Sequence, residues 1–116
     1  MINNPENKFN LEKRTTKFSI DVLDLCKSIK ISIINQNIIK QILKSTTSVG
    51  ANYFEANGAI THKICICKKE ARETKYWLML LWKTNPEKEK YLKDLLNECQ
   101  ELTLIFSKII LTIRKK

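Results

Sequence analysis

Hydrophobic residues recur along this chain in steps of three and four, the spacing that places side chains on one face of an α-helix. Four such series follow one another: Leu11, Thr15, Phe18, Val22, Leu25 and Ile29; then Ile39, Ile42, Thr46, Val49, Tyr53 and Ala56; then Ile64, Cys67, Ala71, Thr74, Leu78 and Leu81; then Leu92, Leu95, Cys99, Leu102, Phe106, Ile109 and Ile113. Alternating steps of three and four are the packing period of antiparallel helical bundles. We therefore expect an all-α, up-down-up-down antiparallel four-helix bundle that forms a single domain.

The residues between these series predict where the helices begin and end. Asn35 is a suitable N-cap for the second helix, and Gly58 is a residue type that ends helices. Asn85-Pro86 separates the third helix from the fourth, because proline disfavours helical backbone in the residue before it. These signals predict helices at roughly 9–30, 36–58, 62–84 and 87–114. Only two glycines and two prolines occur, which favours long helices over a turn-rich β architecture.

A stripe of small and polar residues runs down one side of the second helix. It contains Gln41, Ser45, Ser48, Asn52, Glu55 and Ala59. Buried amides and carboxylates cost free energy unless they are paired, so two interpretations are open. The first is a structural network in which Asn52 and Glu55 hydrogen-bond to the third helix. Its candidate members are Ser48, Asn52, Glu55, Glu70 and Glu73. The second is a ligand or partner pocket, lined by Ser48, Asn52, Glu55 and Glu73.

The formal net charge of +9 is the second informative feature of the chain. Such an excess attracts polyanions, which means nucleic acid or an acidic membrane surface. The excess is densest in residues 61–83, which contain six basic and two acidic residues. Candidate phosphate contacts there are Lys68, Arg72, Lys75 and Lys83, which fall within about 80° of one another on a helical wheel. The alternative is a solvated face that keeps the bundle soluble.

Catalytic chemistry is sought and not found in the sequence. A di-iron bundle needs Glu-x-x-His on two helices, whereas His62 is the one histidine and no glutamate lies three residues before it. Cys65 and Cys67 lie about 200° apart around a helix, so they cannot chelate one metal ion together. No Gly-rich phosphate loop and no serine with a neighbouring base occur. We expect no enzyme activity, no metal and no cofactor.

No uncharged run approaches the about 20 residues that a membrane-spanning helix needs. The N-terminus also lacks the apolar core of a secretory leader. The four cysteines fit small, reduced core residues. These features predict a cytoplasmic protein without a membrane partner.

Phe54, Tyr76 and Trp82 are expected to project away from the hydrophobic faces of their helices. Together with Trp77 they are the candidate residues of an oligomer interface. Exposed apolar patches mark association surfaces. We therefore expect a homo-oligomer.

Three blocks of sequence carry a resemblance to a known family. They are LEKRTTKF (Leu11–Phe18), QILKSTTSVGANYFEANGA (Gln41–Ala59) and KKEARETKYWLMLL (Lys68–Leu81). In this order they resemble the four-helix bundle family named after the 23S rRNA-intervening sequence proteins. The resemblance implies a homopentamer shaped as a barrel with a central channel. It also implies a fold similar to the accessory variability determinant of diversity-generating retroelements, a basic pentamer that binds nucleic acid and a reverse transcriptase.

This chain departs from the family pattern between its second and third helices. The family usually has a Ser-x-x-Asp-Phe segment there, whereas Ile60-Thr61-His62-Lys63 follows Ala59 directly.

Two functional hypotheses result from the sequence. One is a non-enzymatic, oligomeric accessory protein that binds RNA or DNA with low sequence specificity. The other is a scaffold that recruits a protein partner and has no role with nucleic acid.

Overall fold

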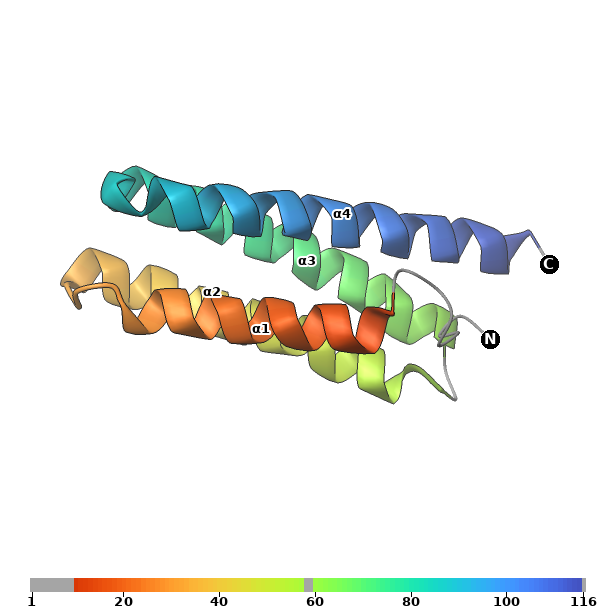
Figure 1. The fold of residues 1–116 in the computed structure, drawn as a ribbon. Helices are drawn as coiled ribbons and strands as arrows, with labels where there is room; N and C mark the ends of the chain where they lie inside the picture. The colour runs from red at the N-terminus through yellow and green to blue at the C-terminus, as the bar shows by residue number, and fades with distance from the viewer. Residues whose placement is uncertain (1–9, 58–59, 116) are drawn as a thin grey trace.

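The computed structural model describes residues 10–57 and 60–115. Over these residues the chain forms four α-helices and no strand, which confirms the all-α prediction. The helices are α1 (Leu11–Lys27), α2 (Ile33–Phe54), α3 (Ile60–Thr84) and α4 (Glu89–Arg114) (Figure 1). Two single-turn 3-10 helices, η1 (Glu55–Asn57) and η2 (Pro86–Lys88), lead into α3 and α4.

Consecutive helices lie side by side along most of their length (Figure 1). Glu55 after α2 pairs with Lys63 in the first turn of α3, and Thr84 at the end of α3 hydrogen-bonds Asn35 near the start of α2. Helices α2 and α3 are therefore antiparallel. Arg114 at the end of α4 likewise approaches Cys65 near the start of α3. Helices α1 and α4 also touch, but they make the least extensive contact of the adjacent pairs.

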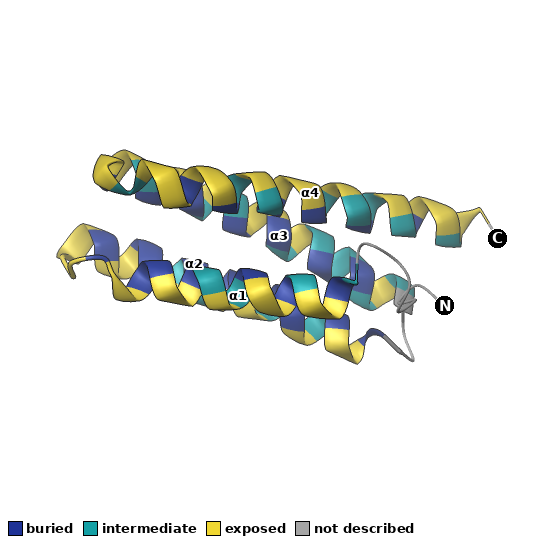
Figure 2. Ribbon diagram, viewed as in Figure 1, coloured by how far each residue is buried: buried dark blue, intermediate teal, exposed yellow. Residues whose placement is uncertain are grey.

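The core lies where the predicted hydrophobic faces meet (Figure 2). All predicted members of the first three series are buried. The fourth series is right as far as Phe106 and wrong beyond it, because Ile110 is buried while Ile109 and Ile113 remain half-buried. An α-helix has 3.6 residues per turn, so a strict seven-residue repeat drifts around it over several turns.

The helix boundaries differ from the sequence expectation at the connection between α1 and α2. Helix α1 ends at Lys27, and α2 already begins at Ile33. Ser32, with extended backbone, is the N-cap, and its hydroxyl accepts a hydrogen bond from the Asn35 backbone N–H at 3.0 Å. Asn35 is therefore not a cap. It is one turn inside the helix, where its side chain is buried.

The remaining ends lie within a few residues of the expectation. Regular helix stops at Phe54 rather than at 58, α3 begins at Ile60 rather than at 62, and α4 begins at Glu89 after the turn of η2. Gly58 and Ala59 lie outside the described residues. The expected stop at Gly58 therefore stays a prediction.

Candidate nucleic-acid interface

Helix α3 carries the candidate cations along the edge that faces α4. Lys68 and Arg72 are one turn apart, and both line an open hollow of about 400 Å³. Its other lining residues are Cys65, Lys69 and Glu73. The guanidinium of Arg114, from the end of α4, lies 3.9 Å from the Cys65 sulfur atom. Several cations therefore surround one hollow of the surface.

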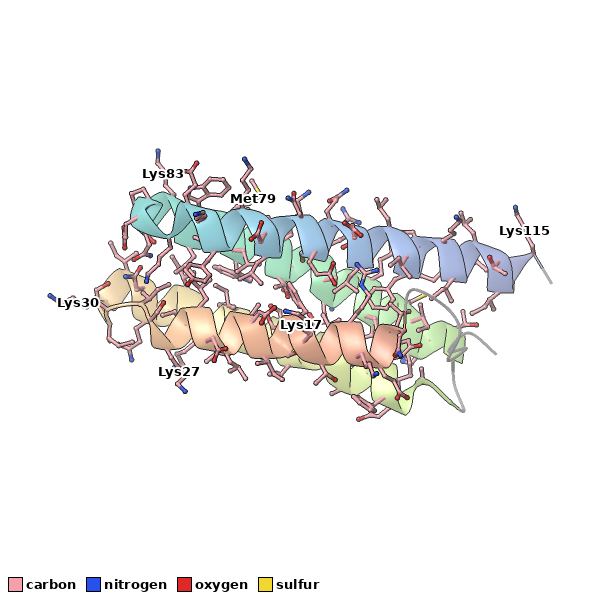
Figure 3. All side chains as sticks on the ribbon, in the orientation of Figure 1. Lys17, Lys27, Lys30, Met79, Lys83 and Lys115 are labelled. Carbon is pink, nitrogen blue, oxygen red and sulfur yellow. The ribbon has the colours of Figure 1, made fainter. Side chains whose placement is uncertain are left out.

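The other two candidate cations lie further along this edge and do not line the hollow. Lys75 is half-buried, and its ammonium group donates a hydrogen bond to the side-chain oxygen of Gln100 on α4 at 2.8 Å. Lys83 lies in the last turn of α3, one turn after Met79. It is at the opposite end of the bundle from Lys115, near the C-terminus of the chain (Figure 3). The structure therefore brings together two of the four predicted residues, Lys68 and Arg72.

Sequence reasoning missed Lys69 and Arg114. Lys69 follows Lys68 in the sequence, but it lies about 100° further around the helix. It was therefore not included in the predicted row of cations. Arg114 is 49 residues from Cys65. No local sequence pattern indicates that Arg114 lies close to Cys65.

The cations of this hollow form no ion pair among the described residues, although the carboxylate of Glu73 lines the hollow beside them. The ion pairs of the described residues are Arg14 with Glu98 and Glu101, Lys17 with Asp21, and Lys63 with Glu55. None of these involves Lys68, Lys69 or Arg72. A side-chain hydrogen bond with Glu70 raises the pKa of Glu73, while the charges of Lys69 and Lys44 oppose this shift.

The predicted polar network is only partly present. The amide of Asn52 donates to the backbone oxygen of Ser48 at 2.8 Å and to its hydroxyl at 3.0 Å, so it bonds within α2 and does not reach α3. Glu55 is exposed and reaches α3 at the surface, by accepting a hydrogen bond from Lys63 at 2.8 Å. Glu70 contributes its backbone oxygen, which accepts from the Thr74 hydroxyl.

A buried polar link between α2 and α3 lies one turn before Ser48. The hydroxyl groups of Thr74 and Ser45 are hydrogen-bonded to each other at 2.8 Å, and both residues are buried. Ser45 belongs to the predicted stripe, while Thr74 was placed in a hydrophobic series. Their pairing depends on the register of two helices, which the sequence does not display.

A polar groove of about 260 Å³ lies between α2 and α3. Its lining residues are Gln41, Lys44, Ser45, Lys69, Glu70, Glu73 and Trp77. Of the predicted pocket residues, Glu73 lines this groove, whereas Ser48, Asn52 and Glu55 do not.

The aromatic candidates for association do not form one patch. Phe54 is exposed and lies near Ile20 of α1. Tyr76 is exposed on α3 and contacts the half-buried Trp77 edge to face, with ring centroids 5.1 Å apart. Trp82 does not project away from the bundle as expected, because it packs against the core.

Two of the four cysteines, Cys67 and Cys99, are fully buried in the packed core. Burial raises the pKa of each to about 12. Among the described residues no group of three or more His, Cys, Asp or Glu side chains could hold a metal ion. No helix in that part of the chain is long and apolar enough to cross a membrane.

Comparisons with known proteins agree with this architecture. A family model described as 23S rRNA-intervening sequence protein matches residues 7–108. Among solved structures, the chain resembles a protein of unknown function from the S23 ribosomal protein family of Bacteroides thetaiotaomicron VPI-5482. The two share 31% sequence identity with a TM-score of 0.74, over 85% of this chain and 96% of the other. The curated proteins contain no match.

Proposed function

Because the chain belongs to the 23S rRNA-intervening sequence protein family, we propose that it is a non-enzymatic accessory protein that binds nucleic acid. It binds RNA or DNA in the cytoplasm, with low sequence specificity, through the edge of α3 that faces α4. The contacts are made to phosphates by Lys68, Arg72, Lys75 and Lys83, with Lys69 beside them.

One observation carries this proposal. Lys68, Lys69 and Arg72 line a single hollow, and none of them has an ion-pair partner among the described residues. Unpaired cations at this spacing bind phosphate oxygens and release the counterions of the nucleic acid. Such contacts fix the position of a nucleic acid without reading its bases, which accounts for the low sequence specificity.

The proposal includes assembly of the up-down-up-down bundle into a homopentamer, as the family resemblance implies. Phe54 and Tyr76 are exposed on different helices. Two different apolar sites on each subunit suit the head-to-tail interfaces from which rings are built. A ring would repeat the cationic hollow on every subunit, and linked sites bind one long polyanion more tightly than separate sites do.

The test is fluorescence anisotropy with a labelled RNA hairpin at 50 mM and 200 mM salt. We expect binding at the lower salt and steep weakening at the higher salt. The combined variant Lys68→Gln, Arg72→Gln, Lys75→Gln and Lys83→Gln reduces the salt slope by roughly 0.7–0.9 for each phosphate contact removed.

The matched control is the variant Lys13→Gln, Lys27→Gln, Lys30→Gln and Lys40→Gln. It removes the same charge from exposed positions on α1, α2 and the segment between them. Figure 3 shows Lys27 and Lys30 at the α1 side of one end of the bundle. An equal loss of RNA binding in both variants, or no binding at 50 mM salt, contradicts the proposal.

The exposed side chains of Phe54, Tyr76 and Met79 favour a second candidate function, that of a scaffold that recruits a protein partner. Purification from the host then yields one stoichiometric protein partner that nuclease treatment does not remove. Loss of that partner in the nuclease-treated sample argues against the scaffold.

A further inference from the structure

A recess between α1 and α4 differs in character from the cationic edge of α3. It has a volume of about 440 Å³. Its lining residues are Asp21, Asp24, Leu25, Ser28, Lys88, Tyr91, Asp94 and Leu95. Leu25 and Leu95 belong to the core and form an apolar floor, while the Tyr91 side chain at the rim is 67% exposed. We call this recess the α1–α4 groove.

Ion pairs close the groove at one end and leave the rest open. Arg14 of α1 binds the carboxylates of Glu98 and Glu101 on α4 and holds the two helices together there. Further along, Asp21 and Asp24 of α1 share the groove with Asp94 of α4. This stretch between the two helices remains an open recess.

The groove is acidic although the whole chain carries a net charge of +9. Among the described residues Asp24 and Asp94 form no ion pair, while Asp21 pairs with Lys17. Lys88 is the one cation that lines the groove. These carboxylates repel the phosphates of a nucleic acid, so the groove is not an extension of the α3 edge.

We propose that the α1–α4 groove binds a short, basic amphipathic helix of another protein. An apolar side chain of that helix packs on Leu25 and Leu95 beside the ring of Tyr91. Lysine or arginine side chains on its flanks pair with Asp24 and Asp94. This goes beyond the proposed nucleic-acid binding and does not depend on it.

The shape of the groove favours a helix as the bound element. Two antiparallel helices present a furrow between their ridges of side chains, and a third helix packs into such a furrow. From Asp21 to Ser28 the open stretch of α1 is about 10 Å long at 1.5 Å per residue, which is the length of two helical turns. The described part of the chain has no strand edge to which an extended peptide could add.

The experiment uses a fluorescein-labelled 14-residue helical peptide with leucines on one face and lysines on the other, titrated with the full chain. Its counterpart with glutamates in place of the lysines is the peptide control. The groove variant is Asp21→Asn, Asp24→Asn and Asp94→Asn. The matched control variant, Glu12→Gln, Glu55→Gln and Glu73→Gln, removes the same number of charges outside the groove.

We expect the lysine peptide to bind, and the groove variant to weaken this binding about tenfold, because it removes the two charge contacts with Asp24 and Asp94 and the nearby negative charge of Asp21. Tyr91→Ser weakens it several-fold, because the ring covers the apolar side chain of the peptide. The control variant and the glutamate peptide separate groove recognition from general charge attraction. The four-cation variant of α3, which tests RNA binding, leaves peptide binding unchanged.

Three outcomes overturn the proposal. The first is an equal loss of peptide binding in the groove and control variants. The second is the absence of binding at about 1 mM peptide, the limit of weak specific affinity. The third is a change in the mass of the groove variant measured by light scattering, because it shows that the groove is a contact between copies of this chain.

Discussion

Asn35 and Asn85 exchange side-chain hydrogen bonds although they lie 50 residues apart in the sequence. The amide nitrogen of Asn35 donates to the Asn85 side-chain oxygen at 3.2 Å, and the amide nitrogen of Asn85 donates back at 3.0 Å. Asn35 also donates to the backbone oxygen of Lys30. The pair therefore fastens the connection between α1 and α2 to the turn between α3 and α4.

Replacing Asn85 by alanine is expected to lower the free energy of unfolding by about 2 kcal/mol, because it leaves a buried amide on Asn35 without this partner. Urea denaturation measures the loss. Asn97→Ala, at an exposed position of α4, is the control and changes stability by less than about 0.5 kcal/mol. Equal losses in the two variants contradict a structural role for the pair.

A double-mutant cycle tests the link between Ser45 and Thr74. Ser45→Ala and Thr74→Val each destabilise the protein. Each variant removes one hydroxyl group of the pair and leaves the other buried without this partner. The double variant loses less than the sum, with a coupling of about 1 kcal/mol in the free energy of unfolding. Additive losses show that the two hydroxyl groups act independently.

The connection of α1 to α4 through Arg14 gives a third prediction. Arg14→Gln removes the paired hydrogen bonds to Glu98 and lowers the free energy of unfolding by about 1 kcal/mol. Arg14→Lys restores only part of it, because an ammonium group cannot bind both carboxylate oxygens in the planar geometry of a guanidinium. Thermal denaturation at low and high salt measures both variants. Full recovery by lysine shows that charge alone matters.

The buried thiols make stability depend on alkaline pH. Burial raises the pKa of Cys67 and of Cys99 from 9.0 to about 12. Below about pH 9 both states of the protein keep their thiols protonated, so their contribution to stability is complete. Between pH 9 and 12 the unfolded chain ionises first, and stability falls as the pH rises.

The measurement is the free energy of unfolding between pH 7 and pH 11 under reducing conditions. The slope contributed by each thiol is at most about 1.4 kcal/mol per pH unit. The double variant Cys67→Ala and Cys99→Ala loses stability through its cavities, but its curve is flatter above pH 9. A slope identical to that of the unaltered protein disproves the assignment to the thiols.

The proposed nucleic-acid edge gives a prediction about single residues. Arg72→Gln is expected to weaken RNA binding more than Lys83→Gln, because Arg72 shares its hollow with Lys68 and Lys69. Removal of one phosphate contact changes the affinity about tenfold at low salt. Anisotropy titrations at 50 mM salt compare the two variants. The opposite order moves the binding site toward the other end of α3.

The sequence by itself determined which residues form helices and which of their faces are buried. Helical periodicity is a local property, since residues three and four apart share a face whatever the rest of the chain does. For this reason the first three hydrophobic series were predicted without error, and the fourth as far as Phe106. The row of cations on α3 was visible for the same reason.

Only the tertiary structure decided which polar groups meet. The bonds between Asn35 and Asn85 and between Ser45 and Thr74, and the approach of Arg114 to Cys65, depend on the register of one helix against another. The acidic lining of the α1–α4 groove likewise combines residues of two helices that are neighbours in space and distant in sequence. Register is set by side-chain packing over the whole bundle, so a pattern read along one helix does not contain it.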